Sequence, residues 1–107
     1  MDPGELRNRI TLQKKKEATG PVLPLDEYED YKTIWAKASY LTGRTLYAAR
    51  AANVKTDVEF IIRYRTDIDE TMRVKYKGKT YEIDAILPLD NKEEYLAIKA
   101  HEVKHDM

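Results

Sequence analysis

The feature that most constrains the fold is the stretch from Asp57 to Leu87, in which three consecutive segments alternate between apolar and polar side chains. Alternation with a period of two places the apolar side chains on one face of a β-strand. This face contains Val58, Phe60, Ile62 and Tyr64 in the first segment, Met72, Val74 and Tyr76 in the second, and Tyr81, Ile83, Ala85 and Leu87 in the third. Lys77-Gly78-Lys79 separates the last two segments and supplies a glycine for positive φ, so we expect a tight hairpin there. These segments form the predicted nucleus of a β-sheet.

Two segments that precede this nucleus also alternate. Residues 7–13 place Ile10 and Leu12 on one face, and residues 31–41 carry a row of small and apolar side chains opposite a row that includes Trp35. We predict two further strands, with Trp35 as a large packing anchor of the second one.

The segment from Lys92 to Val103 allows two interpretations. Leu96, Ile98 and Ala100 alternate as in a strand, whereas Leu96, Ala100 and Val103 have helical spacing behind Asn91, a possible cap residue. The pattern alone leaves both a strand and a helix open.

Two connections between the expected strands differ in composition. Lys14 to Asp30 has no periodic pattern, begins with lysines and ends with acidic residues, so we predict a long flexible loop. Gly43 to Asn53 is rich in alanine and arginine and follows Thr42, a plausible N-cap, so we predict a short helix. Its bulky apolar residues are only Leu46 and Tyr47, which would bury little area against the sheet. We therefore expect 42–55 to be the most mobile segment.

The composition excludes several classes of protein. With 107 residues the chain has room for a single domain, 1–107, and no window approaches the roughly 20 apolar residues of a membrane span. The start MDPGELRNR lacks an apolar signal region, so we expect a cytosolic product. The absence of cysteine excludes disulfides and thiolate metal sites. Nineteen basic and nineteen acidic residues give a net charge of zero, which argues against an autonomous nucleic-acid binder.

One motif suggests a metal site. His101-Glu102-Val103-Lys104-His105 fits H-E-x-x-H, in which two histidines on one helix face bind zinc. We expect no third ligand after it, and we predict a solvated, flexible tail over 103–107 instead. The sequence has no Ser/His/Asp arrangement and no glycine-rich phosphate loop, so we predict no enzyme activity, no catalytic residue, no metal site and no cofactor.

Two groups of basic residues are candidates for binding. Lys14-Lys15-Lys16 at the start of the long loop could contact phosphate or an acidic partner. A second group, on the outer face of the nucleus, could form a basic ladder unless cross-strand acidic residues neutralise it; this group comprises Arg63, Arg65, Arg73 and Lys75, with Glu59, Glu82 and Asp84 as the acidic residues. This ladder leaves open the alternative of a small β-barrel nucleic-acid-binding module.

The order of these segments resembles one family. The relevant stretches are GELRNRITLQ, the long loop, Trp35-Ala36, the segment from Gly43 to Val54, IRYR at 62–65 and MRVKYKGKTYEIDAI at 72–86. Together they resemble the small head-tail joining proteins, also called head completion or stopper proteins, of long-tailed bacteriophages and prophages. The resemblance extends from about Gly4 to Glu102.

The resemblance implies a mainly β fold. The expected architecture is a small antiparallel β-barrel of five to six strands, with one short α-helix between the second and third strands and a long loop after the first. It also implies a final strand at Tyr95 to Glu102. The implied function is that of a structural virion protein, a ring subunit that joins the DNA-filled head to the tail, retains the genome and offers a platform for the tail.

The resemblance also implies partners and site residues. The partners would be other copies of the chain, portal or adaptor proteins, a tail-terminator protein and the packaged DNA, at the head-tail interface of a virion made in the bacterial host cytoplasm. Residues implied to face the channel are Arg44, Tyr47, Arg50 and Lys55. Residues expected at assembly contacts are Lys14, Lys15, Lys16, Asp26 and Glu27.

Overall fold

The structure is a computed structural model that describes residues 3–16, 28–89 and 94–103. These residues form six strands, with the helix α1 (Gly43–Ala51) inserted between β2 and β3 and a short 3-10 helix (Pro3–Glu5) before β1. The strands are β1 (Asn8–Lys15), β2 (Tyr28–Tyr40), β3 (Val58–Arg63), β4 (Arg73–Tyr76), β5 (Lys79–Pro88) and β6 (Tyr95–Glu102). None of the helices in these residues is long and apolar enough to cross a membrane.

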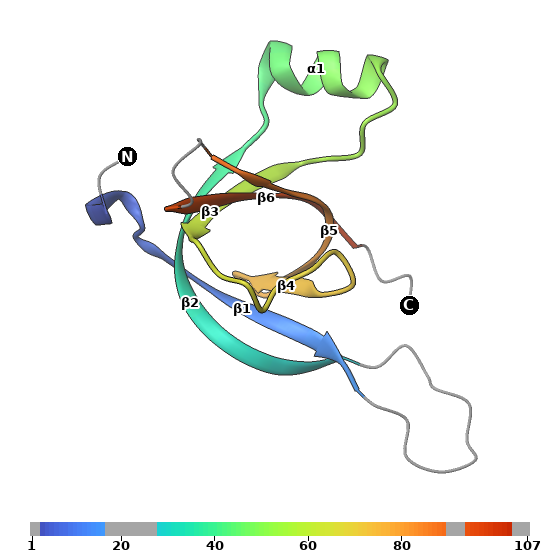
Figure 1. The fold of residues 1–107 in the computed structure, drawn as a ribbon. Coiled ribbons are helices and arrows are strands. Elements are labelled where there is room, and N and C mark those ends of the chain that lie inside the picture. The colour runs from blue at the N-terminus through green and yellow to red at the C-terminus, as the bar shows by residue number, and fades with distance from the viewer. Residues whose placement is uncertain (1–2, 17–27, 90–93, 104–107) are drawn as a thin grey trace, which may run out of the picture.

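The strands close into a barrel in the order β1-β2-β3-β6-β5-β4, and all neighbours are antiparallel (Figure 1). Closure depends on the pairing of β1 with β4, in which Thr11 lies opposite Lys75. The predicted antiparallel barrel is therefore confirmed, as is a short helix between the second and third strands.

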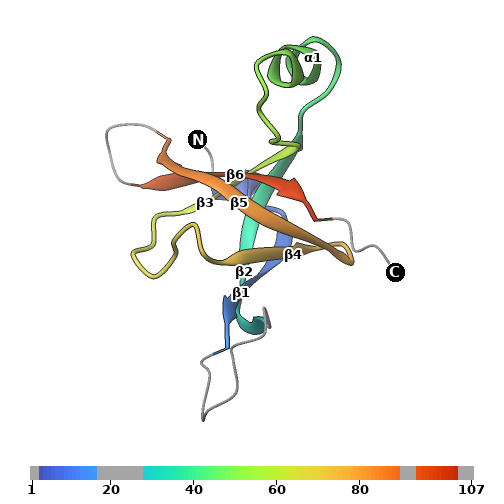
Figure 2. The same cartoon turned by 90° about the vertical axis from the view of Figure 1, so that its right-hand side faces the viewer.

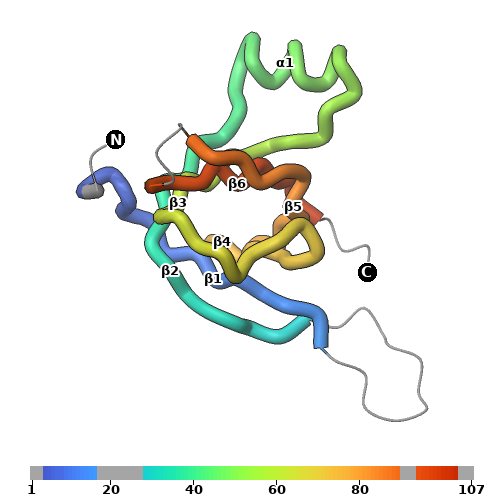
Figure 3. Tube along the Cα trace, viewed as in Figure 1, coloured from blue at the N-terminus to red at the C-terminus, as the bar shows by residue number. Residues whose placement is uncertain are grey.

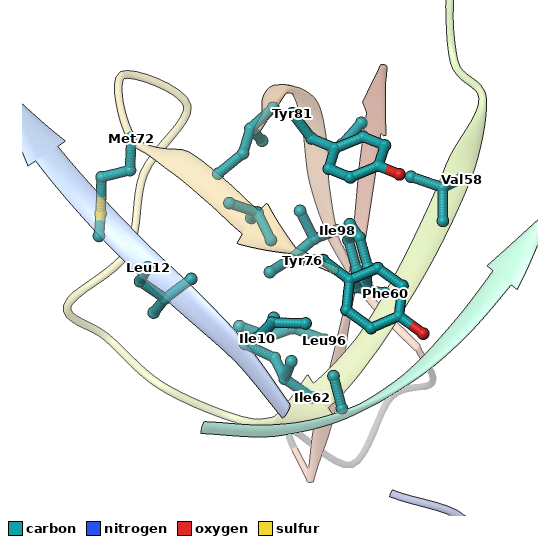
Figure 4. Packing of buried hydrophobic residues seen from close by; sticks show 14 residues of the cluster. Ile10, Leu12, Val58, Phe60, Ile62, Met72, Tyr76, Tyr81, Leu96 and Ile98 are labelled. Atoms are coloured by element: carbon teal, nitrogen blue, oxygen red, sulfur yellow. The ribbon is translucent and has the colours of Figure 1, made fainter. Parts of the chain in front are cut away.

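The core fills the barrel interior with the inward side chains of all six strands (Figure 4). Phe60 lies between two tyrosines, with edge-to-face contacts to Tyr76 and Tyr81 at centroid distances of 5.5 Å each. The fully buried large side chains are Tyr81, Phe60, Ile10, Leu12, Ile62, Ile98, Val58 and Val74. This is the apolar face that the alternation in the sequence predicts, since every second residue of a strand points to the same side.

The turn between β4 and β5 and the strand β6 match their predictions. Lys77 and Gly78 both have positive φ, at 50° and 77°, which is the backbone geometry that two-residue hairpins favour because it matches the strand twist. Residues 95–102 pair with β3 on one side and with β5 on the other, so this segment is a strand.

The prediction that Trp35 is a buried packing anchor is wrong. Its side chain is on the outer face of β2 and is 51% exposed, with Arg9 stacked 4.7 Å from the ring centroid. The inward positions of β2 belong to the opposite row, in which Ala36 is fully buried and Ile34 and Ala38 pack against the core. The small side chain of Ala38 lies opposite the large ring of Phe60 on β3.

The ends of several predicted strands also need correction. β1 continues to Lys15 and β2 begins at Tyr28, so part of the predicted loop from Lys14 to Asp30 is strand. Cross-strand contacts explain the extension, since the side-chain amide of Gln13 donates to Asp30 over 2.9 Å. Residues 17–27 of that loop lie outside the described residues. Tyr64 and Leu87, predicted to point inward, are 43% and 46% exposed. β3 ends before Tyr64, and a register shift between Ile83 and Ala85 changes the alternation of β5, so that Ile86 packs against the core in place of Leu87.

Candidate functional site

The helix α1 stands away from the barrel on two extended connections (Figure 3). None of the residues 43–51 is buried, and Tyr47 is 79% exposed. Thr42 lies at the N-cap position as predicted, but its side chain makes no capping hydrogen bond. We call residues 42–55 the α1 arm. The arm gains little stability from apolar burial, because none of its helix residues is buried.

Arg50 attaches the α1 arm to the barrel. Its Nη1 donates to the carbonyl of Val54 over 2.8 Å and to the carbonyl of Thr56 over 3.2 Å, and its Nη2 forms a short ion pair with Asp57. The other carboxylate oxygen of Asp57 accepts a hydrogen bond from the backbone N–H of Glu102 over 2.9 Å. Asp57 therefore connects the last turn of the helix to the end of β6. We call this set of contacts the Arg50 clamp.

A polar network continues from the clamp across the barrel wall. The buried hydroxyl of Thr56 donates to Asp84 over 2.9 Å, and the other oxygen of Asp84 lies 2.7 Å from Nδ1 of His101. Nε2 of His101 lies 3.4 Å from Glu82, which also accepts from Arg73 over 3.3 Å. This network fixes the base of the arm through side chains of β4, β5 and β6.

The network also shows how the H-E-x-x-H motif is placed. His101 and Glu102 lie on the strand β6, and both ring nitrogens of His101 face carboxylates of β5. Residue 105 lies outside the described residues. Within the described part of the chain, no group of three or more His, Asp or Glu side chains is arranged to hold a metal ion.

Two tyrosines have pKa values raised by their surroundings. Burial raises the pKa of Tyr81, with a further contribution from its hydroxyl contact with Tyr40 at 3.1 Å. A hydrogen bond to the Asp67 carboxylate, 2.6 Å away, raises the pKa of Tyr31. Hydrogen bonds from the Arg65 guanidinium and from the Tyr31 hydroxyl lower the pKa of Asp67. Both tyrosines stay neutral near pH 7, so neither supplies a charged group to the surface.

The structure separates the two groups of predicted site residues. Arg44, Tyr47 and Lys55 are exposed on the α1 arm, and Arg50 lies on the same arm with its guanidinium held by the clamp. The end of β1 and the start of β2 extend from the opposite side of the barrel (Figures 1 and 2). Lys14 and Lys15 end β1 and Lys16 follows them, and Nζ of Lys14 lies 3.9 Å from the ring centroid of Tyr31. Asp26 and Glu27 lie outside the described residues.

Sequence patterns did not predict the clamp or one surface hollow. Arg50 and Asp57 are brought together by the turn at Asn53, which has a φ of 61°, and no periodicity marks such a pair. The hollow has a volume of about 490 Å³ and is lined by Leu6, Arg7, Trp35 and Arg63. It exists because Trp35 points outward, which was the opposite of the prediction.

Comparison with known proteins identifies the family. A model of the family described as phage head completion protein matches residues 1–103. The chain belongs to this family. The described barrel and the family match agree with the resemblance inferred from the sequence, and they assign the chain to the structural proteins of phage-type virions. No curated protein sequence matches.

Two solved structures share the fold of this head completion protein. The solution structure of protein SF1141 from Shigella flexneri 2a is 30% identical and has a TM-score of 0.74, with 95% of this chain and 96% of that chain covered. A chain from the virion of a native gene transfer agent particle is 17% identical and has a TM-score of 0.59, with 92% and 96% covered. The second likeness concerns the fold alone.

Proposed function

We propose that this head completion protein is a ring subunit at the junction between the head and the tail. In this proposal the ring lies beneath the portal and adaptor proteins, closes the DNA channel with the α1 arm and offers a docking platform to the tail-terminator protein. The observation that carries the proposal is the α1 arm itself, an exposed helix that a closed barrel holds at a distance. The buried core cluster is made of residues outside α1, so the barrel does not need this helix for folding.

The charges of the arm suit a position near DNA. Arg44 and Lys55 are exposed, and neither side chain has an ion-pair or hydrogen-bond partner among the described residues. Several copies of these cations around one axis would attract DNA phosphates. Tyr47 at 79% exposure would provide the bulk that narrows the channel. Arg50 was also predicted to face the channel; its clamp contacts suit it to holding the arm in position.

The opposite end of the subunit would make contacts within the virion. Lys14 and Lys15 lie at the end of β1, on the side of the barrel away from α1 (Figure 1), and Lys16 follows them. Together with Asp26 and Glu27 they are the proposed assembly contacts. The chain would be made in the host cytoplasm and then enter the particle, with no catalytic role.

The predicted basic ladder of Arg63, Arg65, Arg73 and Lys75 is not continuous, because β3 and β4 are not neighbours in the barrel, and this favours the proposed function over a nucleic-acid-binding module. Arg65 pairs with Asp67 over 2.7 Å, and Arg73 pairs with Glu82 over 3.3 Å. Two of these four cations are therefore neutralised in the folded chain, whereas a nonspecific nucleic-acid binder needs a continuous track of unneutralised cations along its surface.

Electron microscopy of particles from a strain that lacks the protein tests the proposal. We expect heads without tails that lose their DNA, together with free tails. Complementation with the intact chain should restore full, tail-bearing particles. Full and stable tail-bearing particles in the absence of the protein would contradict the proposed function.

A further inference from the structure

Two adjoining hollows beside β2 form one groove, which we call the Trp35 groove. The first is the hollow lined by Leu6, Arg7, Trp35 and Arg63. The second, of about 330 Å³, shares three of these residues and extends along β2 to Lys32. Trp35 is 51% exposed. Arg9 stacks 4.7 Å from the ring centroid but lines neither hollow, so part of the ring is open to a ligand.

The groove follows an unpaired edge of β2. β1 pairs with β2 from Tyr28 to Ala36, whereas β3 pairs with β2 only from Lys37 to Tyr40. On the β3 side, residues 32–36 therefore have no partner strand within the described ranges. The consecutive residues 32–35 all line the second hollow. Because successive side chains of a strand point to opposite faces, such a set lies along the strand edge. An exposed edge can pair with a further strand.

The lining of the groove is basic. Its cations are Arg7, Lys32, Arg63 and Arg65, and no carboxylate lines either hollow. Arg65 is paired with Asp67 over 2.7 Å, so its charge is neutralised. Lys32 and Arg63 have no ion-pair or hydrogen-bond partner among the described residues.

The other carboxylates on this wall have cationic neighbours outside the groove. Glu5 lies 4.0 Å from Lys37, and Glu59 lies opposite Lys99 in the ladder between β3 and β6. In the part of the chain that the structure describes, neither carboxylate forms an ion pair with a cation of the groove. The groove therefore combines an open aromatic ring, an unpaired strand edge and two free positive charges. These features together favour an acidic, extended segment of protein.

The chain itself contains a segment of this kind. The stretch between Lys16 and Lys32 is the longest in the sequence without a lysine or arginine. It includes Val-Leu-Pro-Leu-Asp-Glu at residues 22–27. Residues 86–91 have the related sequence Ile-Leu-Pro-Leu-Asp-Asn, so Leu-Pro-Leu-Asp occurs twice in the chain.

The second occurrence shows how such a sequence pairs with a strand. Pro88 at the end of β5 lies opposite Leu96 of β6. The N–H of Leu89 donates to the carbonyl of Tyr95 over 3.0 Å. Because hydrogen-bonded and non-hydrogen-bonded pairs alternate between antiparallel strands, the proline nitrogen, which has no proton to donate, faces away from β6. Leu-Pro-Leu is therefore compatible with strand pairing, and residues 23–25 have the same alternation.

We propose that residues 22–27 of one copy add as a short strand to the unpaired edge of β2, in the Trp35 groove of a neighbouring copy. The inference rests on the proposed function, because it assigns a contact between ring subunits to the predicted assembly residues Asp26 and Glu27. The leucines of the segment would cover the open part of the indole ring, and the two carboxylates would lie beside Lys32 and Arg63. In such complexes backbone hydrogen bonds supply affinity and side chains supply specificity.

The segment cannot reach the groove of its own chain. Trp35 is seven residues along β2 from Tyr28, a separation of about 20 Å in a strand. Leu25 is three residues before Tyr28 and lies at most about 11 Å from it. The end of β1 and the start of β2 extend from the barrel on the side away from α1 (Figure 2), where they carry the segment towards other subunits. A contact between two different surfaces of identical subunits can close into a ring.

Binding of a synthetic peptide of residues 17–27 to the purified full-length chain is the first test. Trp35 is the one tryptophan in the chain, and the peptide has none, so indole emission reports on the groove. The titration is made at a chain concentration at which light scattering shows a monomer. We expect a saturable shift of the emission to shorter wavelength. No saturable shift at millimolar peptide would overturn the inference.

Methylation of single backbone nitrogens in the peptide tests the strand pairing. If the segment pairs as the second occurrence does, the N–H of Leu25 points to β2 and the N–H of Asp26 points away from it. Methylation at Leu25 should weaken binding at least tenfold, whereas methylation at Asp26 is the matched control and should change it less than twofold. Equal affinities of the two methylated peptides would contradict strand addition.

A charge exchange tests the role of the carboxylates. A peptide with Asp26→Lys and Glu27→Lys should bind at least tenfold more weakly to the wild-type chain, and it should bind more tightly to the Arg63→Glu chain than to the wild type. Circular dichroism of the Arg63→Glu chain establishes that the barrel is folded. No difference in affinity between the two peptides would show that the charges of the groove do not select the segment.

Cross-linking in assembled particles tests whether the contact joins neighbouring copies. The chain has no cysteine, so introduced thiols are the only ones in it. Particles made with Asp26→Cys/Arg63→Cys are treated with a short bismaleimide, and we expect a ladder of cross-linked copies beyond dimers. Asp26→Cys/Lys75→Cys places the second thiol on β4, away from the groove, and should give no ladder.

The outcomes separate this inference from the proposed function. If particles need the protein, yet Asp26→Cys/Arg63→Cys is incorporated without a ladder, the contact is wrong while the function stands. If full tail-bearing particles form without the protein, the function itself fails. A saturable change in Trp35 emission with an oligothymidine probe, and none with the peptide, would make the groove a nucleic-acid site and overturn the inference.

Discussion

Different interactions stabilise the barrel and the α1 arm. The barrel has a closed ladder of six strands around Phe60, Tyr76 and Tyr81, whereas the arm has no buried residue in its helix and is attached by polar contacts of one arginine. Apolar burial therefore stabilises the first region, and hydrogen bonds with one ion pair hold the second. Because buried apolar area contributes most of the folding free energy, the barrel should fold with or without the arm.

This difference suggests a separation of stability from function within one small chain. A segment that contributes little to folding can change its charge or shape without loss of the fold. The arm would therefore serve the channel, and the barrel would serve as its support and as the contact surface for neighbours. Substitutions in the barrel, in the clamp and on the outer surface test this separation.

The largest expected effect is that of Phe60→Ala in the barrel. Phe60 is fully buried and contacts Tyr76 and Tyr81 edge to face, so its truncation leaves a cavity and removes both ring contacts. We expect the free energy of unfolding to fall by about 3–5 kcal/mol. Urea titration measures it, with Tyr47→Ala on the arm as the matched aromatic control, which should cost less than about 0.5 kcal/mol. Equal losses for the two variants would remove the distinction between the regions.

A smaller effect is expected from Arg50→Ala, which removes the clamp. The ion pair with Asp57 is partly exposed, so the free energy of unfolding should fall by only about 1 kcal/mol. Amide exchange should lose its protection over 43–51, while the strand β3 stays protected. Arg44→Ala, an exposed arginine on the same helix, should change neither quantity. A loss above about 3 kcal/mol would show that the arm belongs to the cooperative unit of the barrel.

Trp35→Ala should have a still smaller effect on stability. The side chain is half exposed on the outer face, and its main described contact is with Arg9. We expect the free energy of unfolding to fall by less than about 1 kcal/mol, because an exposed side chain leaves no cavity. Urea titration followed by circular dichroism measures the change. A loss of about 3 kcal/mol or more would mean that the ring is buried in the core.

The smallest effect concerns pH and the Asp67 contacts. Hydrogen bonds from Arg65 and Tyr31 lower the pKa of Asp67, so the carboxylate stabilises the folded state when it is charged. This contribution is complete above the unfolded pKa of about 4 and declines as the pH falls towards the folded pKa. The difference in unfolding free energy between the wild type and Asp67→Asn should therefore shrink between about pH 7 and about pH 2.5. A constant difference would show that the charge of Asp67 contributes nothing.

Sequence patterns predicted the barrel better than its surfaces, for a physical reason. The positions of Val58, Phe60 and Ile62 follow from alternation, because one face of a strand must be buried. For Trp35 the size of the side chain suggested burial. The alternation along β2 instead places Ala36 inward and Trp35 outward. Alternation also left 92–103 open between strand and helix, and the family resemblance was needed to choose the strand.

The site residues depend on tertiary structure and were only partly predictable. The weak apolar face of 43–53 indicated a poorly anchored helix, and the exposed α1 agrees with it. The contact between Arg50 and Asp57 requires the chain to return to the barrel, and the outward direction of Trp35 depends on which face of β2 the closed barrel buries. Neither follows from the spacing of residues along the chain.

The central claim is that the α1 arm retains DNA while the barrel supplies the fold. The most direct test replaces residues 44–53 with a glycine-serine linker of equal length and measures the DNA that remains in purified particles after incubation. We expect particles that contain the variant in normal amounts but lose their DNA, while those made with the intact chain retain it. Normal retention of DNA in particles that contain the linker variant would contradict the claim.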